Sequence, residues 1–262
     1  MKDEPLVSVV IPTFNSERFL ERCLRSVKEQ TCDNIEIIVV DNYSTDKTNE
    51  IAKKYGGKII SSDAKRSEAR NIGAKGASGV WVFFVDSDME LGFSVVNECV
   101  RKTAEGYDGI IVPEVSVGEG FWAKCKALEK SLYVGDDLIE AARFFRKTVF
   151  DSVRGYDLDL EAGEDWDLNQ RIRKSGYRIG RIEATIDHNE GRLSLPSTMQ
   201  KKKYYGKTLK HYALKHPDDA KRQLGLIRPA FLRRWKKLAR DPIHATGMLV
   251  MKTCEFVATK LH

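Results

Sequence analysis

Two aspartates separated by one residue, in Asp86-Ser87-Asp88, are the side chains of this chain best suited to chemistry. They follow an apolar run, residues 80–85, whose β-branched and aromatic side chains predict a buried strand. Open α/β sheets bind ligands outside the carboxyl ends of their strands. Two carboxylates there offer hard oxygen donors for Mg²⁺ or Mn²⁺ and a bound phosphate. Because such a tripeptide often arises by chance, it is a weak signal by itself.

Two earlier apolar runs, residues 6–11 and 35–40, also end in polar residues. These are Pro12, Thr13 and Asn15 after the first run and Asp41 after the second. A helical pattern follows each of them, and a strand–turn–helix repeat predicts parallel strands with right-handed crossovers. The polar residues and Asp86 would then lie along one edge of one sheet. Asn, Asp and Ser are also favoured in ordinary turns and helix caps, which is the alternative.

A second acidic pair, Glu164 and Asp165, follows Gly163 at the start of a helical pattern. Glycine allows a sharp turn there. The N-terminus of a helix stabilises a charged carboxylate, which keeps it available as a base. Acidic residues are also common in the first helical turn, and we interpret Asp167 as such a helix residue.

In its motifs and their order the chain resembles the family 2 glycosyltransferases of the GT-A fold. The motifs that carry the resemblance are residues 7–15, 39–48, 69–73, 86–88 and 163–168. The resemblance implies an α/β, Rossmann-like catalytic domain with a mostly parallel sheet flanked by helices. It also implies an inverting, metal-dependent hexosyltransferase that takes a sugar from a nucleotide-sugar donor.

The resemblance further implies roles for single residues. Asp165 would be the catalytic base, and Glu164 would support the site or touch the acceptor. The residues expected to bind the donor are Pro12, Thr13, Asn15, Asp41, Arg70, Asp86 and Ser87. The metal ligands would be Asp88, Asp86 and His188, which follows a strand predicted over residues 180–186. Neutral imidazole is a reasonable partner for Mn²⁺, although a lone histidine is more often structural.

The centre of the chain corresponds to the acceptor side of the resembled fold. Trp122 lies at the start of a predicted helix there, and Arg143 lies in a predicted strand over residues 141–146. Arg143 could meet an anionic group of the acceptor, such as a lipid phosphate. It could equally pair with a carboxylate of the core, and the sequence leaves both alternatives open.

Charge is distributed unevenly along the chain, whose net charge is +6. Residues 197–262 contain sixteen Lys and Arg against four Asp and Glu, so the preceding part is acidic. We therefore expect a GT-A catalytic domain over residues 1–196 and a basic helical extension over residues 197–262. The helices expected in the extension are residues 197–216, 218–227, 230–240 and 243–260.

One helix of the extension has an apolar face formed by Phe231, Leu232, Trp235 and Leu238, with arginines and lysines around it. A basic amphipathic helix with a tryptophan is typical of an interfacial membrane helix, here one that would bind an anionic surface. The alternative is that this face packs on the catalytic domain or on a second copy in a homodimer. No nucleic-acid motif accompanies the basic residues, so we expect no nucleic-acid partner.

The expected function is transfer of one sugar from a nucleotide-sugar to a polyprenyl-phosphate or dolichyl-type lipid-linked acceptor. As the donor we expect a UDP-sugar in preference to a GDP-sugar. The five cysteines have no paired spacing, which is typical of reduced thiols. No apolar stretch approaches the roughly 18–20 residues that span a bilayer. We therefore expect a cytoplasmic protein, peripheral on the cytoplasmic face of the membrane.

Two other functions stay open. A soluble glycosyltransferase acting on a polysaccharide or protein glycan would have the same catalytic half, with the extension as a dimer interface. A nucleotidyltransferase also uses strand-end carboxylates and a metal. It would usually have a Gly-rich, basic loop after its first strand, which residues 12–16 lack.

Overall fold

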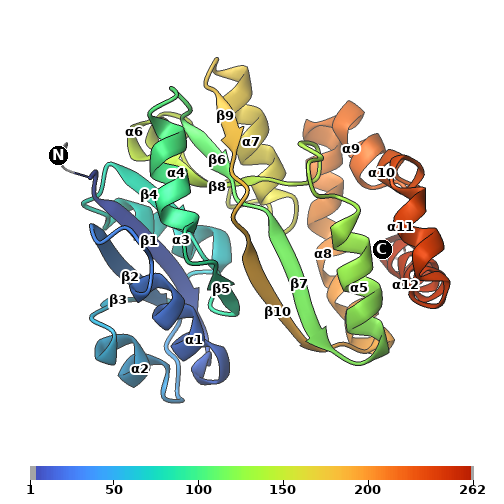
Figure 1. Cartoon of the computed structure of the whole chain (residues 1–262), viewed down its shortest axis with the longest axis horizontal. Coiled ribbons are helices and arrows are strands. Elements are labelled where there is room, and N and C mark those ends of the chain that lie inside the picture. Colours follow the sequence, from blue (N-terminus) through green and yellow to red (C-terminus); the bar gives the residue numbers. More distant parts are fainter. Residues whose placement is uncertain (1–3, 261–262) are drawn as a thin grey trace. The chain divides into compact units, whose positions relative to one another are not determined.

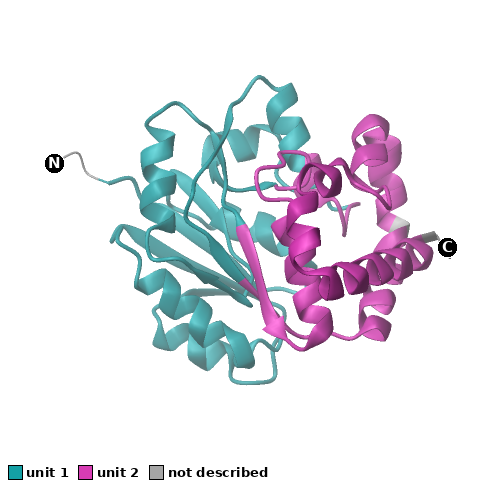
Figure 2. Cartoon of the chain, turned by 45° about the vertical axis from the view of Figure 1, so that its right-hand side comes forward, with its two compact units in different colours: residues 1–113, 141–158, 168–187 teal, residues 114–140, 159–167, 188–262 magenta. Residues whose placement is uncertain are grey.

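The structure is a computed structural model that describes residues 4–260. It contains two compact units, shown in different colours in Figure 2. Unit 1 comprises residues 1–113, 141–158 and 168–187, and unit 2 comprises residues 114–140, 159–167 and 188–262. Unit 2 thus combines the basic extension with two segments from the middle of the chain. The domain boundary expected at residue 196 stays a prediction.

Unit 1 is built around a seven-stranded sheet with the order β3-β2-β1-β4-β8-β6-β9 (Figure 1). Its strands are β1 (Val7–Thr13), β2 (Ile35–Asp41), β3 (Lys58–Ser61), β4 (Trp81–Phe84), β6 (Gly109–Ile111), β8 (Ala142–Arg146) and β9 (Ile179–Arg181). The first four pair in parallel, as do β6 and β9, whereas β8 is antiparallel to both of its neighbours. The mostly parallel α/β sheet expected from the sequence is confirmed.

Helices cover both faces of this sheet because its strands bury apolar side chains on both sides. One face packs against α1 (Glu17–Lys28), α2 (Thr48–Lys54) and α4 (Val95–Thr103). The other packs against α3 (Arg66–Lys75), α6 (Lys147–Ser152) and the later residues of α7 (Glu164–Lys174). In β1, Val9 belongs to the first core and Val10 to the second, as the alternation of side chains along a strand requires. A short strand, β5 (Met89–Leu91), packs against α1.

Gly73 marks a close approach of α3 to the sheet. A Cβ at this position would lie 2.2 Å from Cγ1 of Val10 and 3.1 Å from Cγ2 of Val40. We expect Gly73→Ala to lower the free energy of unfolding by about 1–3 kcal/mol, because the extra methyl group overpacks the core. Urea unfolding followed by circular dichroism measures this change.

Gly76→Ala in the same segment is the matched control. Its Cβ would meet first the tip of the Ile60 side chain, at 2.9 Å, and a flexible side chain can move aside. Equal destabilisation by both substitutions would contradict the close approach at Gly73.

Unit 2 contains two strands, one helix from the middle of the chain, the first turn of α7 and the C-terminal helices. Its elements are β7 (Glu114–Glu119), α5 (Phe121–Ser131), β10 (Ile186–Arg192), α8 (Leu195–Lys215), α9 (Pro217–Gln223), α10 (Pro229–Arg233), α11 (Trp235–Arg240) and α12 (Pro242–Lys260). The strand β7 is the neighbour of β10, which begins in unit 1, and α12 packs against α5 and α8. None of the helices within residues 4–260 is long and apolar enough to cross a bilayer.

The strand predicted over residues 180–186 is wrong. The structure has β9 ending at Arg181 and β10 beginning at Ile186, so His188 lies within a strand rather than after one. The backbone amides of Glu183 and Ala184 donate to the carboxylate of Glu98, at 3.2 and 3.0 Å. These amides are therefore taken by a side chain of α4 instead of a neighbouring strand.

The helix predicted over residues 230–240 is also divided, because α10 ends at Arg233 and α11 begins at Trp235. Its apolar face is divided too. Phe231 and Leu238 pack in a core cluster with Tyr133 and Met248, whereas Leu232 and Trp235 are exposed. Half of the face thus stabilises unit 2 itself.

Candidate active site

Asp41, at the end of β2, is fully buried and accepts hydrogen bonds on both carboxylate oxygens. The hydroxyls of Thr13 (3.0 Å) and Ser44 (2.5 Å) donate to Oδ1. The amide of Ser44 and the side chain of Asn49 donate to Oδ2, each at 2.9 Å. Burial alone would raise the pKa of Asp41, but these hydrogen bonds outweigh it and lower the pKa below its usual value. Asp41 therefore fixes the loop after β2, and its contact with a donor stays a prediction.

The loops that follow β1, β2 and β4 are joined by hydrogen bonds. Asn15 has a left-handed backbone conformation, with φ of 45°. Its amide donates to Oγ of Ser44 (2.8 Å), and its Oδ1 accepts from the amide of Thr45 (2.9 Å). The hydroxyl of Ser87 donates to that of Ser16 at 3.0 Å. The edge expected to bind the donor is thus one connected network, with Pro12 half-buried in β1 beside it.

Asp86 lies between two arginines. Nη2 of Arg70 donates to its Oδ1 at 2.7 Å, and Nη1 of Arg143 lies 3.5 Å from its Oδ2. The Arg70 side chain is 1% exposed, and its guanidinium also lies over the ring of Tyr156. Burial would raise the pKa of Asp86, but the two positive charges hold it well below its usual range. Arg143 thus contacts a carboxylate of the candidate site, and its contact with an anionic group of the acceptor stays a prediction.

The guanidiniums of Arg70 and Arg143 thus both face the carboxylate of Asp86 at this edge of the sheet. Asp88 is half-buried and lies two residues further along the chain, directly before β5. Asp86 is engaged with cations, and metal binding by Asp88 stays a prediction. A cationic pair beside a carboxylate suits a diphosphate that carries a divalent ion.

The donor set of unit 1 fits Mg²⁺ or Mn²⁺ only together with a phosphate ligand. Within residues 4–260, no group of three or more His, Cys, Asp and Glu side chains is arranged to hold a metal. Mg²⁺ is commonly bound by one or two carboxylates plus substrate phosphates, which is what Asp88 and Asp86 provide for.

His188, the third predicted ligand, belongs to a cluster in unit 2. Its Nδ1 lies 3.0 Å from Nζ of Lys130 and 3.2 Å from Oε2 of Glu114. Lys130 also pairs with Glu190 at 3.1 Å. One ring nitrogen of the imidazole, Nδ1, is thus held by charged neighbours. Metal binding by His188 stays a prediction.

The second acidic pair lies in the first turn of α7, in the part that belongs to unit 2. Gly163 has φ of +82°, and a Cβ there would lie 3.0 Å from the ring of Tyr212, so glycine is required on both counts. Glu164 is buried and Asp165 is half-buried. Nε1 of Trp166 donates to the carbonyl of Ile139 at 2.8 Å, which fixes this turn.

Asp167 has a structural role that the sequence did not reveal. It is fully buried, and its Oδ1 lies 2.7 Å from Nζ of Lys215 and 2.9 Å from Nε2 of His216. Both partners are at the C-terminal end of α8, whose residues are far from Asp167 in the sequence. Asp167 therefore anchors the start of α7, next to the predicted base.

Trp122, predicted for the acceptor side, lies in α5 of unit 2. It is half-buried against the core cluster of that unit and packs edge-to-face on Phe121, with ring centroids 4.9 Å apart. Its contact with an acceptor stays a prediction. The expected donor residues and Arg143 thus belong to unit 1, whereas Glu164, Asp165, His188 and Trp122 belong to unit 2.

The mostly parallel sheet, with carboxylates at the ends of its strands, defines a fold of the GT-A type. The chain belongs to glycosyl transferase family 2, whose profile matches residues 8–153. A relative is EpsJ of Bacillus subtilis (strain 168), described as an uncharacterized glycosyltransferase, with 40% identity over 149 residues. That match covers 55% of this chain and 41% of EpsJ, so the chain spans less than half of this relative's length.

Two solved structures share the fold. The mannosyltransferase PcManGT from Pyrobaculum calidifontis, in complex with GDP-Man and Mn²⁺, has a TM-score of 0.68 and 18% identity. The match covers 99% of this chain and 88% of that protein. S. aureus TarS 1-349 in complex with UDP-GlcNAc has a TM-score of 0.57 and 21% identity, with 78% of this chain and 66% of that protein covered. The GT-A fold predicted from the sequence is confirmed.

Proposed function

We propose that this glycosyltransferase moves one sugar, with inversion, from a nucleotide-sugar to a polyprenyl-phosphate or other lipid-linked acceptor. The observation that carries the donor side is the group of Arg70, Arg143 and Asp86, with Asp88 beside it. Its two guanidiniums are groups that suit the leaving diphosphate of a nucleotide-sugar. The fold neighbours named above were solved with UDP-GlcNAc and with GDP-Man and Mn²⁺, which supports a nucleotide-sugar donor and a divalent ion. As the donor we propose a UDP-sugar in preference to a GDP-sugar.

In this proposal Asp165 takes the proton of the attacking acceptor oxygen. It lies in the first turn of α7, and the contacts of Gly163, Trp166 and Asp167 hold that turn in position. A bound Mg²⁺ or Mn²⁺ ion would offset the charge that develops on the leaving diphosphate. Arg70 and Arg143 supply fixed positive charge at the same edge of the sheet.

A donor panel tests this function. We expect one of UDP-, GDP- and dTDP-sugars to release its nucleotide in the presence of Mn²⁺ and a polyprenyl phosphate in detergent. The release should depend on the lipid and stop when EDTA removes the metal. Donor turnover with soluble glycans alone would indicate a soluble glycosyltransferase that acts on a polysaccharide or protein glycan. Release of pyrophosphate from a nucleoside triphosphate would favour a nucleotidyltransferase.

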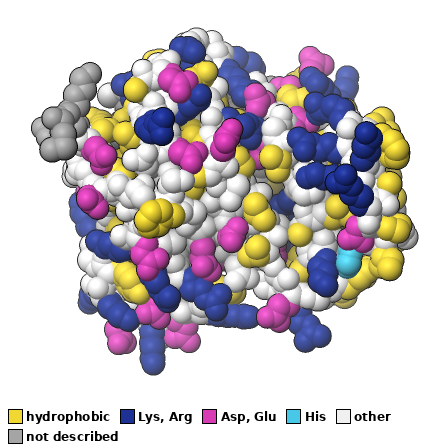
Figure 3. Space-filling view, viewed as in Figure 1, with side chains coloured by type: hydrophobic (Ala, Val, Ile, Leu, Met, Phe, Trp, Pro, Cys, Tyr) yellow, Lys and Arg dark blue, Asp and Glu magenta, His cyan; other side chains and the backbone are white. Residues whose placement is uncertain are grey.

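We also infer that the protein is peripheral on the cytoplasmic face of a membrane, through α10 to α12. Leu232, Trp235 and Ile243 are 71, 59 and 70% exposed. The basic residues Arg233, Arg234, Lys236, Lys237 and Arg240 lie beside them in the chain. Figure 3 shows basic side chains gathered over the region of these helices, with hydrophobic ones at its edge. Apolar side chains surrounded by basic ones suit an anionic lipid surface.

The double substitution Leu232→Ser and Trp235→Ser should weaken binding to phosphatidylglycerol vesicles at least about tenfold, because two exposed apolar groups no longer enter the interface. Co-sedimentation with vesicles measures it. The control is Leu214→Ser in α8, which removes an 82% exposed leucine outside this surface. The surface is a dimer interface instead if two results are found together. The wild-type protein would not bind the vesicles, and size-exclusion chromatography would show a wild-type dimer that the double variant does not form.

A further inference from the structure

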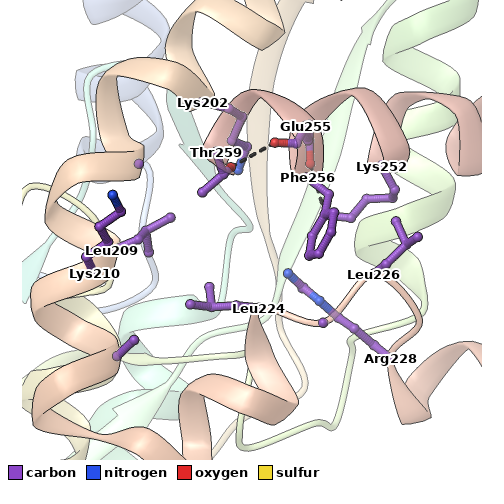
Figure 4. A pocket seen from close by; sticks show the side chains of 13 residues that line it. Lys202, Leu209, Lys210, Leu224, Leu226, Arg228, Lys252, Glu255, Phe256 and Thr259 are labelled. Atoms are coloured by element: carbon purple, nitrogen blue, oxygen red, sulfur yellow. Dashed lines mark hydrogen bonds and ion pairs between the residues drawn. The ribbon is translucent and has the colours of Figure 1, made fainter. Parts of the chain in front are cut away.

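A pocket of about 440 Å³ lies within unit 2 (Figure 4). Residues of α8, α12 and the segment between α9 and α10 line it. The apolar part of the lining includes Leu209, Leu224, Leu226 and Phe256. Its volume is at the low end of the range for small-molecule sites. An apolar lining of this size suits a single hydrocarbon chain rather than the two acyl chains of a bilayer lipid.

The charged residues that line the pocket are mostly cationic: Lys202, Lys210, Arg228 and Lys252 against Glu255. Lys252 is already neutralised, because its Nζ lies 2.9 Å from carboxylate oxygens of both Glu129 and Glu255. Lys126 is a second cation beside the same two carboxylates, with its Nζ 2.9 Å from Glu129 and 3.3 Å from Glu255. Glu255 also attracts Lys202, and Glu129 attracts Arg228, so four cations share two carboxylates and leave positive charge in excess beside the apolar wall.

Arg228 and Lys202 both lie where an anion would be favoured. The guanidinium of Arg228 is stacked over the ring of Tyr133, and its buried Nε has no hydrogen-bond acceptor among the described residues. In Figure 4 this side chain extends from the rim into the space beside Phe256. Burial lowers the pKa of Lys202 to about 8, so an anion nearby would stabilise its charged form. A buried donor without an acceptor is costly, and a ligand oxygen would relieve that cost.

We propose that this pocket binds an isoprenyl phosphate, with its chain along the apolar wall and its phosphate at Lys202 and Arg228. The proposal adds a binding site to the proposed function and rests on it only for the choice of an isoprenyl chain. The pocket wall is also connected with the predicted base. Leu224 and Ala213 of the lining pack in one cluster with Trp166, which follows Asp165 directly. An isoprenyl chain bound here would therefore contact the same cluster of side chains that packs around the first turn of α7, where Asp165 lies.

Isothermal titration of the full chain with farnesyl phosphate, below its micelle concentration and without any donor, tests the site. We expect saturable binding with one site per chain. Farnesol and inorganic phosphate should each bind at least about tenfold more weakly, because each lacks one half of the ligand. Equal binding of farnesol would overturn the role of the two cations. Equal binding of dihexanoyl phosphatidic acid would overturn the preference for a single chain.

Two variants and a control give the residue assignment. Lys202→Gln and Arg228→Gln should each weaken farnesyl phosphate binding about tenfold. Lys203→Gln removes the same charge from the next residue, which is exposed and does not line the pocket, and should bind as wild type does. Because Arg228 packs on Tyr133, a thermal melt checks that its variant folds, and Lys202→Gln carries the test if it does not. Equal affinities of the Lys202 and Lys203 variants would overturn the proposal.

The titration needs neither donor nor turnover, so its outcome separates the site from the proposed function. Binding without transfer from any donor would leave the site standing and remove the lipid-phosphate glycosyltransferase. Lipid-dependent transfer without farnesyl phosphate binding at this pocket would support the proposed function and overturn the binding site.

Discussion

Asp165→Asn should lower kcat about a thousandfold and leave the affinity for the nucleotide-sugar nearly unchanged. A positioned general base typically contributes about 10²–10⁴ to the rate, and an amide of the same shape cannot accept the proton. Asp165 is half-buried in the first turn of α7, and Asp167, two residues later, anchors this turn on α8. Steady-state nucleotide release and titration of the donor measure the two quantities.

The control for this substitution is Asp218→Asn. Asp218 is an exposed acidic residue in the first turn of another helix of the same unit, α9, so the change in charge and helix position is matched. It should keep wild-type kcat. A loss of activity in Asp165→Asn that came with a loss of donor affinity or of folded protein would contradict the role as a base.

Asp86→Ala should lower the free energy of unfolding by about 3–5 kcal/mol. The substitution leaves two largely buried guanidiniums without the carboxylate between them, and breaking a buried ion pair typically costs that much. Urea unfolding measures the loss, and donor binding should fall with it. Arg70→Ala should have an effect of the same order, because it leaves the carboxylate with one partner fewer.

This contribution depends on pH with a definite sign. The pKa of Asp86 is lower in the folded chain than its unfolded value of about 3.9, so its stabilisation is fully present above that value. It is lost as the pH falls through the acidic range, and the gap in stability between wild type and Asp86→Ala should therefore narrow on acidification.

Asp88→Ala is the matched change, because it removes the other carboxylate of the same tripeptide. We expect it to cost less stability than Asp86→Ala does, because Arg70 and Arg143 both contact Asp86. Metal-dependent nucleotide release should nevertheless be lost. If both variants lost the same stability, the division of the two aspartates between ion pairing and metal binding would be wrong.

The sequence by itself predicted β1, β2, β4 and β8 of unit 1 and the helices that follow the first two of them. Apolar runs that end in polar turns are local patterns, and they placed Thr13, Asn15, Asp41 and Asp86 at one edge of a parallel sheet. The need for glycine at residue 163 could also be read locally, because a sharp turn before a helix requires it. Both predictions depend only on neighbours along the chain.

Contacts between distant segments were decided by the tertiary structure. The pairing of Arg143 with Asp86 and the anchoring of Asp167 on α8 join residues that no periodicity relates. The same is true of the apolar face around Trp235, where Phe231 turned inward and Leu232 outward. Pattern shows that a side chain is apolar or charged, but which partner it meets depends on how the elements pack. The pocket around Lys202 and Arg228 exists only because that packing leaves two cations beside an apolar wall.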